Sequence, residues 1–463
     1  MTQHQRKEPP LLIMQDAIPG IKKFLQPVVM NSRARDLVAC CLIAFLMHSG
    51  KMSATQAAGA VRSQSRHRAQ ICRFLGRKYW KRLNLLKPLQ DALLERESTD
   101  GGVFLFIIDQ TVCSVQAETA QNAYHTRNTQ RRPQKSKRRQ KKHIKRSCHC
   151  FVMGLLITPS GIRIPFFLPF YTKAYCAEKQ IAHRTQADLA AELIDKLPVP
   201  DSARVIVLGD TAFDAKQIRS SCAQRGFSWI VPANPERVLA GSKPRPKVAS
   251  LIEEMSTQKL TRIEVQAGKG RYVDYRRVSP YRVGLKLKSR TYFVHEERRD
   301  VHSVGKVRLF FSTMKNPKEG HGLRGCKILM TNDKQLSKSE VIEIYSLRWQ
   351  IELFFKELKS SLGFHHYRLR SFERVETWAA LCLAAFIFLE WQRAEKLKHR
   401  KLKKEERAWW KQQRTHGLTL AVRQQTESRE IDLISKALDS KSGVKRLKKL
   451  ITKGYPKEYR IGA

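Results

Sequence analysis

Four side chains that could do acid–base or phosphate-binding chemistry recur at helical spacing between Val341 and Leu362. They are Tyr345, Arg348, Glu352 and Lys359, at relative positions 0, 3, 7 and 14. On a helix that turns about 100° per residue, these four positions lie within roughly 60° of one another. One carboxylate, two cations and a phenol would therefore line a single edge, which could hold an anionic substrate beside an acid.

The surrounding residues predict that this stretch is one helix. Ser337 and Glu340 have the spacing of a capping box at its start. Apolar residues then recur with the helical period and would pack on a core: Ile344, Leu347, Ile351, Phe354, Phe355, Leu358 and Leu362. Taken alone, Arg348 and Glu352 could equally be a surface ion pair four residues apart, worth about 0.2–0.5 kcal/mol.

Two further acids follow apolar strands upstream. Val103–Ile108 is a continuous apolar run that ends at Asp109, and Arg204–Leu208 is followed closely by Asp210. Such runs are typical of parallel strands buried on both faces, and folds of this kind bind ligands at the carboxyl ends of the strands. Either acid could instead simply begin a turn. Asp214 is a poorer candidate, because it falls inside the next predicted helix.

The order of elements around these acids is typical of an RNase-H-like α/β domain, a mixed sheet with flanking helices. After the strand at 103–108, the sequence predicts strands at 148–158 and 162–168, a helix at 177–197, a strand at 204–208, a helix at 213–225 and a strand at 227–231. In this fold, adjacent parallel strands bring their acids side by side. We assign residues 99–231 and 337–395 to this domain, and the second part ends with a predicted helix at 372–393.

A β-rich insertion separates the two parts of the domain at residues 232–336. It begins with a segment rich in Pro and Lys, residues 232–247, that is interpreted as a linker. Strand-like runs separated by turn-forming residues follow at 261–266, 271–277, 291–296, 307–312 and 327–331.

The spacing Y-x2-R-x3-E-x6-K, complete at Tyr345, Arg348, Glu352 and Lys359, resembles the signature of bacterial insertion-sequence transposases of the DDE type. The likeness covers roughly residues 100–395. It implies a catalytic domain with a β-rich insertion and a homodimer that pairs two terminal inverted repeats. It also implies cut-and-paste transposition, in which nicked ends form and reopen hairpins before insertion into target DNA.

The acids fit the chemistry that phosphodiester cleavage requires. Two divalent ions can activate a water and stabilise the leaving oxygen, and hard oxygen ligands favour Mg²⁺ or Mn²⁺. We expect Asp109 to bridge the two ions, while Asp210 and Glu352 each complete one site. Double-stranded DNA would be held by neighbouring residues: Arg348, Lys359 and Tyr345 on its backbone, and Trp349 stacked on a base, as the resemblance implies.

The net charge also indicates a polyanionic partner. Lys and Arg number 88 against 41 Asp and Glu, which gives a formal charge of +47. Such an excess is typical of proteins that bind nucleic acid. The longest apolar run, Trp378–Leu389, is too short to cross a membrane, so we expect a soluble, cytoplasmic, nucleoid-associated bacterial protein. The ten cysteines lack zinc-site spacing and are interpreted as buried free thiols.

The most basic segment lies between the first two predicted strands of the sheet. Residues 127–146 contain eleven Lys or Arg and no acid. The segment could be a solvated, disordered loop, but its position favours contact with a nucleic-acid backbone. The candidate DNA-binding residues here are Arg131, Arg132, Lys137, Arg138, Arg139, Lys141 and Lys142.

The two ends of the chain are predicted to be helical. Residues 1–98 include three short helices that suit a helix-turn-helix, in which basic side chains would face DNA: Arg62, Arg66, Arg68 and Arg73. A plain helical bundle with a basic surface fits them equally well. The basic C-terminal region, residues 396–463, could bind DNA or form a dimer contact.

Two other functions share part of this pattern. Another RNase-H-fold nuclease, such as a junction resolvase, would have the acids without needing the Tyr345-to-Lys359 set. A repurposed, non-catalytic DNA-binding protein would keep the charge and could lose the acids. The presence of Asp109, Asp210 and Glu352 together favours an enzyme.

Overall fold

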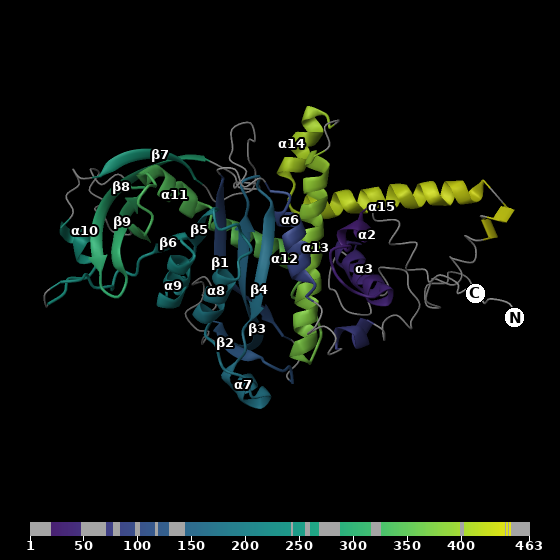
Figure 1. Cartoon of the computed structure of the whole chain (residues 1–463), viewed down its shortest axis with the longest axis horizontal. Coiled ribbons are helices and arrows are strands. Elements are labelled where there is room, and N and C mark those ends of the chain that lie inside the picture. The colour runs from purple at the N-terminus through teal and green to yellow at the C-terminus, as the bar shows by residue number, and fades with distance from the viewer. Residues whose placement is uncertain are drawn as a thin grey trace, which may run out of the picture.

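A computed structural model gives the fold of the chain (Figure 1). The structure describes residues 20–47, 71–76, 84–97, 102–115, 119–128, 144–241, 244–254, 260–267, 288–315, 326–398, 402–439, 441–442 and 444–445. The predicted helix-turn-helix residues Arg62, Arg66 and Arg68 lie outside these ranges, as does the strand predicted at 271–277. Within the part described, no helix combines the length and apolarity needed to cross a membrane.

One ten-stranded mixed sheet forms the centre of the described structure. Its strands are β1 (Val103–Ser114), β2 (Tyr124–Asn128), β3 (Ile144–Ile157), β4 (Arg163–Pro169), β5 (Arg204–Leu208), β6 (Ser228–Pro232), β7 (Thr261–Ala267), β8 (Lys288–Val301), β9 (Gly305–Thr313) and β10 (Lys327–Thr331). These bounds confirm the predicted strands at 204–208 and 327–331. The other predicted strands in the described part lie within a few residues of expectation, except that β1 and β8 are longer, and β2 was not predicted.

Five strands of this sheet have the arrangement expected of an RNase-H-like domain. They lie side by side in the order β4-β3-β1-β5-β6. The β3 strand pairs antiparallel with β4 and β1, whereas β1, β5 and β6 are parallel to one another. The apolar side chains of β1 and β5 are buried, as continuous runs in parallel strands predict. The mixed α/β fold is therefore consistent with the predicted class.

The strands of the predicted insertion extend the same sheet. β10 pairs antiparallel with β6 on one side and with β9 on the other, and β8 and β7 follow. This end of the sheet lies on the opposite side of β1 from β4, as Figure 1 shows. The backbone hydrogen bonds of β6, which would otherwise be an unpaired edge, are thus satisfied by β10.

Helices cover the sheet and continue beyond it on the side of β4 that faces away from β1 (Figure 1). They are α2 (Ile21–Phe24), α3 (Ser32–Met47), α6 (Leu86–Leu94), α7 (Lys173–Lys179), α8 (Gln186–Asp195), α9 (Lys216–Gln224), α10 (Ser250–Glu254), α11 (Lys338–Ser346), α12 (Trp349–Ser361), α13 (Phe372–Lys398), α14 (Lys404–Gln412) and α15 (Thr415–Leu438), with a 3₁₀ turn, η2, at Thr211–Phe213.

Two stretches predicted as single helices are each divided in the structure. The helix expected at 177–197 is α7 and α8, separated at Gln180, whose φ is 54°, and restarted by a capping box between Thr185 and Asp188. The helix expected at 341–362 is α11 and α12. Between these two helices, the backbone N–H groups of Leu347 and Arg348 bond to carbonyls three residues back, so the turn tightens toward 3₁₀ geometry.

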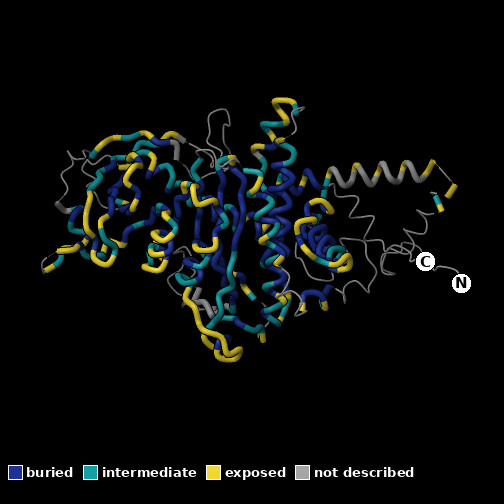
Figure 2. The backbone as a smooth tube through the Cα atoms, in the orientation of Figure 1, coloured by how far each residue is buried: buried dark blue, intermediate teal, exposed yellow. Residues whose placement is uncertain are grey.

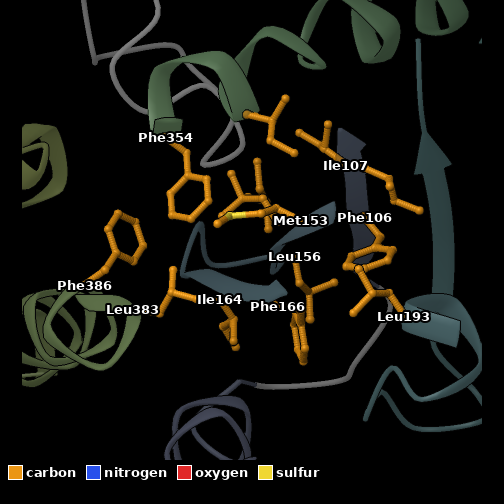
Figure 3. Close-up of a cluster of buried hydrophobic side chains, with 14 of the residues drawn as sticks. Phe106, Ile107, Met153, Leu156, Ile164, Phe166, Leu193, Phe354, Leu383 and Phe386 are labelled. Atoms are coloured by element: carbon orange, nitrogen blue, oxygen red, sulfur yellow. The ribbon is translucent and has the colours of Figure 1, made fainter. Parts of the chain in front are cut away.

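The long helix α13 and the shorter α12 share the central core with the sheet. The ring centroids of Phe354 on α12 and Phe386 on α13 lie 4.9 Å apart, edge to face. Both point into the cluster that contains Phe106 of β1 and Met153 of β3 (Figure 3). Burial is densest along the sheet and α13, as Figure 2 shows. The apolar face predicted for the Glu352 helix is therefore packed on the sheet.

A buried ionic network also ties α12 to its neighbours. Arg163 of β4 donates to Glu357 of α12 at 2.9 Å and to Glu390 of α13 at 2.7 Å, and Arg393 also donates to Glu390. Thr415 at the start of α15 donates to Glu357 at 2.8 Å. Burial raises the pKa of Glu390, but Arg163 and Arg393 outweigh it and hold that pKa below its usual value. The network stabilises these elements only if every charge keeps its partner.

Replacing Arg163 with methionine should lower the free energy of unfolding by about 3–5 kcal/mol, because two buried carboxylates lose their common partner. Urea unfolding monitored by circular dichroism measures this change. The control is Lys196→Ala, which removes an exposed ion pair with Glu192 and should cost no more than about 0.5 kcal/mol. Equal losses in the two variants would contradict a structural role for the network.

Candidate active site

The pairing of β1 with β5 sets the two aspartates at the same level of the sheet. The last parallel pair joins Ile107 to Leu208, and two residues further along each strand lie Asp109 and Asp210. The prediction that Asp109 ends its strand is wrong. β1 continues to Ser114, because β3 goes on pairing with it after β5 has ended. Asp109 is therefore held by a regular strand.

Asp210 lies just beyond β5, where its side chain caps the turn η2. Its carboxylate accepts a hydrogen bond from the backbone N–H of Ala212 at 2.9 Å. Asp214 precedes α9 instead of lying inside it, so the reason first given for its exclusion is wrong. Its buried carboxylate is paired with Arg219 and Arg237, which gives it a structural role.

Arg348 links Glu352 to Asp109 by contacting both carboxylates. The Arg348 guanidinium lies 2.8 Å from Glu352 and 3.4 Å from Asp109, measured from nitrogen to oxygen. Glu352 is in the first turn of α12, and Arg348 is the residue that caps this helix. The structure thus brings an acid from β1, an acid from α12 and an arginine together, with Asp210 just beyond the end of the adjoining strand β5.

The electrostatics of Asp109 reflect this crowding. Burial raises the pKa of its carboxyl to about 6, and the negative charges of Asp210 and Glu352 act in the same direction. The backbone N–H of Gln110 and the Arg348 cation oppose the rise. A strongly perturbed acid with named charged neighbours is typical of a functional site.

Tyr345 and Lys359, the other members of the sequence signature, border these acids. Tyr345 is buried, which raises its pKa to about 12, and its hydroxyl is 3.5 Å from the backbone oxygen of Gly209, the residue before Asp210. Lys359 is partly exposed and donates to the backbone oxygen of Val112 at 3.0 Å. Arg348 and Lys359 therefore contact β1, Tyr345 contacts the residue after β5, and Glu352 is bonded to Arg348.

Lys327 at the start of β10 is a neighbour that the sequence alone did not indicate. Its ammonium lies 4.4 Å from the centroid of the Tyr345 ring. Nothing in the local sequence marks this lysine among the many others, because its position depends on the pairing of β10 with β6.

Several predicted DNA-binding residues remain predictions. Trp349 is half-buried and packs against the apolar core. The basic residues Arg131, Arg132, Lys137, Arg138, Arg139, Lys141 and Lys142 lie outside the described residues. The described ends of their segment, β2 and β3, pair with each other, and the last pair joins Asn128 to Ile144.

The acids suit a hard divalent cation, although they are not gathered as ligands around one point. Among the described residues, no group of three His, Cys, Asp or Glu side chains is placed to hold a metal ion. Arg348 lies between Asp109 and Glu352 and supplies positive charge there. Carboxylate oxygens are nevertheless the kind of ligand that Mg²⁺ and Mn²⁺ prefer.

In metal-free buffer, the stability of the protein should fall as the pH rises through the titration of Asp109. The folded-state pKa, about 6, exceeds the ordinary pKa of 3.8, so the contribution of this group is complete below pH 4 and is lost above pH 6. Asp109→Asn should therefore be more stable than wild type by on the order of 2–3 kcal/mol at pH 7.5, and by less at pH 5. Thermal unfolding with EDTA tests this. Asp201→Asn, at an exposed turn, is the control. A difference in stability between Asp109→Asn and wild type that does not change with pH would contradict the expectation.

Comparison with known proteins identifies the family. The family model described as "Transposase DDE domain" matches residues 105–388, more than half of the chain. This range includes Asp109, Asp210 and Glu352, and it begins in β1 and ends in α13. No curated protein matches the chain. The chain therefore belongs to the transposase DDE domain family.

Proposed function

We propose that this member of the family is a cut-and-paste transposase, which cleaves DNA at the terminal inverted repeats of a mobile element and joins the ends to target DNA. The observation that carries the proposal is the meeting of Asp109, Glu352 and Arg348, with Asp210 just beyond the end of the adjoining strand β5. A nuclease of another class would have no need of the Tyr345-to-Lys359 signature, and a binding protein would have no need of the acids.

Asp109, Asp210 and Glu352 would hold two divalent ions, Mg²⁺ or Mn²⁺. When bound, such ions lower the pKa of a water nucleophile and stabilise the charge on the leaving oxygen. The chain's own contribution is to fix the acids on two strands and one helix, so that little reorganisation is needed when DNA arrives.

Arg348 would bind a phosphate beside the scissile bond. In the DNA-free protein its guanidinium is held by Asp109 and Glu352. A phosphate offers the same planar fork two anionic oxygens, so the guanidinium can exchange its carboxylate partners for DNA without losing charge compensation. Lys359 and Tyr345 would contact the same backbone.

The remaining steps follow from the sequence resemblance. The freed 3′-OH would attack the opposite strand to form a hairpin, which is opened before insertion, and two copies of the chain would pair two ends. Trp349 would stack on a displaced base, which requires it to leave part of its present packing. The basic segment 127–146 and the N-terminal arginines would bind flanking phosphates.

Glu352→Gln should lose DNA processing and keep DNA binding. The assay is Mg²⁺-dependent nicking or hairpin formation on a labelled duplex taken from the DNA flanking the gene. We expect the rate to fall by more than roughly a hundredfold, the upper end of what changes beside metal ligands cost. Binding should be unchanged, because the variant keeps the shape of the side chain.

Glu405→Ala, which removes an exposed carboxylate from α14, is the matched control and should process DNA like wild type. Equal products from wild type and Glu352→Gln would remove Glu352 from catalysis. DNA binding with no product from wild type, under conditions where a divalent ion is present, would favour the non-catalytic alternative.

A further inference from the structure

Lys327 lies at the same edge of the sheet as the aspartates. Parallel pairing of Leu208 with Ile230 sets Asp210 level with Pro232, and antiparallel pairing joins Pro232 to Leu329. Lys327 lies two residues before Leu329 in β10, and so just beyond the level of Asp210 and Pro232. The sheet register therefore places a lysine from the insertion beside the carboxyl ends of β1, β5 and β6.

Tyr345 fixes the position of this lysine relative to the acids. The Lys327 ammonium lies over the Tyr345 ring at 4.4 Å, within the range of a cation–π interaction. The ring is buried and its hydroxyl is directed to Gly209, beside Asp210. Lys327 is an exposed residue, and the ring holds its ammonium near the site.

The two lysines of the site lie on opposite sides of the acids. Lys359 contacts β1 at Val112, whereas Lys327 begins β10, three strands away through β5 and β6. At about 4.8 Å per strand, this separation is roughly 14 Å.

We propose that Lys327 binds a backbone phosphate of the DNA strand on the insertion side of the acids, at a different position from the phosphate held by Lys359. The inference rests on the proposed function, which sets the direction in which the DNA would cross the site. It gives the insertion a direct role in holding the substrate. The DNA strand would then cross the ends of β1, β5, β6 and β10 in turn.

The salt dependence of binding tests this assignment. Fluorescence anisotropy with a random-sequence 30-base-pair duplex is measured in EDTA across a range of KCl concentrations, because a phosphate contact is independent of sequence and of metal. Lys327→Ala should reduce the slope of log K against log salt by about 0.9 and weaken binding by about eightfold at 0.1 M salt. Lys327→Arg should retain the wild-type slope.

Lys306→Ala is the matched control. Lys306 is also an exposed lysine of the insertion, but it lies six residues along β9 from Ser312, the partner of Lys327, and so near the opposite edge of the sheet. The slope of log K against log salt for Lys306→Ala should equal that of wild type. An unchanged slope for Lys327→Ala, or the same reduction for both alanine variants, would overturn the proposal.

The same protein preparations allow the DNA contact of Lys327 and the proposed transposase activity to be tested separately. Cleavage by wild type compared with Glu352→Gln tests the transposase activity, whereas the slope tests Lys327 in the absence of metal. A reduced slope with no cleavage by wild type would leave Lys327 as a DNA contact and overturn the transposase proposal alone.

Discussion

The parallel pairing of β1 with β5 is the constraint on which the candidate site depends. With Ile107 opposite Leu208, Asp109 and Asp210 stand level on neighbouring strands. A slip of one residue would turn either side chain to the other face of the sheet. The apolar side chains of both strands are buried, so such a slip would also expose core residues. The hydrophobic pattern that makes these strands therefore fixes the chemistry at their ends.

The third acid depends on a different interaction, the anchoring of α12. Phe354 packs into the core, and the buried carboxylate of Glu357 is held by Arg163 and Thr415. These contacts come from α13 and α15 and from β4, which is far from both helices in sequence. Glu352 lies on the same helix, five residues before Glu357. Its distance from Asp109 is thus set by packing on the face of α12 that the substrate would never touch.

The sequence predicts those parts of the structure that depend on local patterns. The runs at Val103–Ile108 and Arg204–Leu208 identify buried strands, and the capping box at Ser337 identifies the start of α11. The sequence did not predict the division between α11 and α12, because apolar residues go on recurring with the helical period through Leu347. The continuation of β1 past Asp109 and the position of Lys327 depend on pairing with β3 and β6, and no local pattern carries that information.

The charges of the site explain why an arginine belongs among three acids. Asp109, Asp210 and Glu352 together concentrate negative charge in a partly buried place, and the raised pKa of Asp109 shows that this arrangement opposes ionisation. Arg348 compensates part of that charge in the DNA-free protein. On the proposed function, DNA phosphates would compete for this cation, and divalent ions that enter with the DNA would compensate the carboxylates that the cation leaves. Binding of substrate and of metal should therefore favour each other, since each relieves the charge imbalance that the other creates.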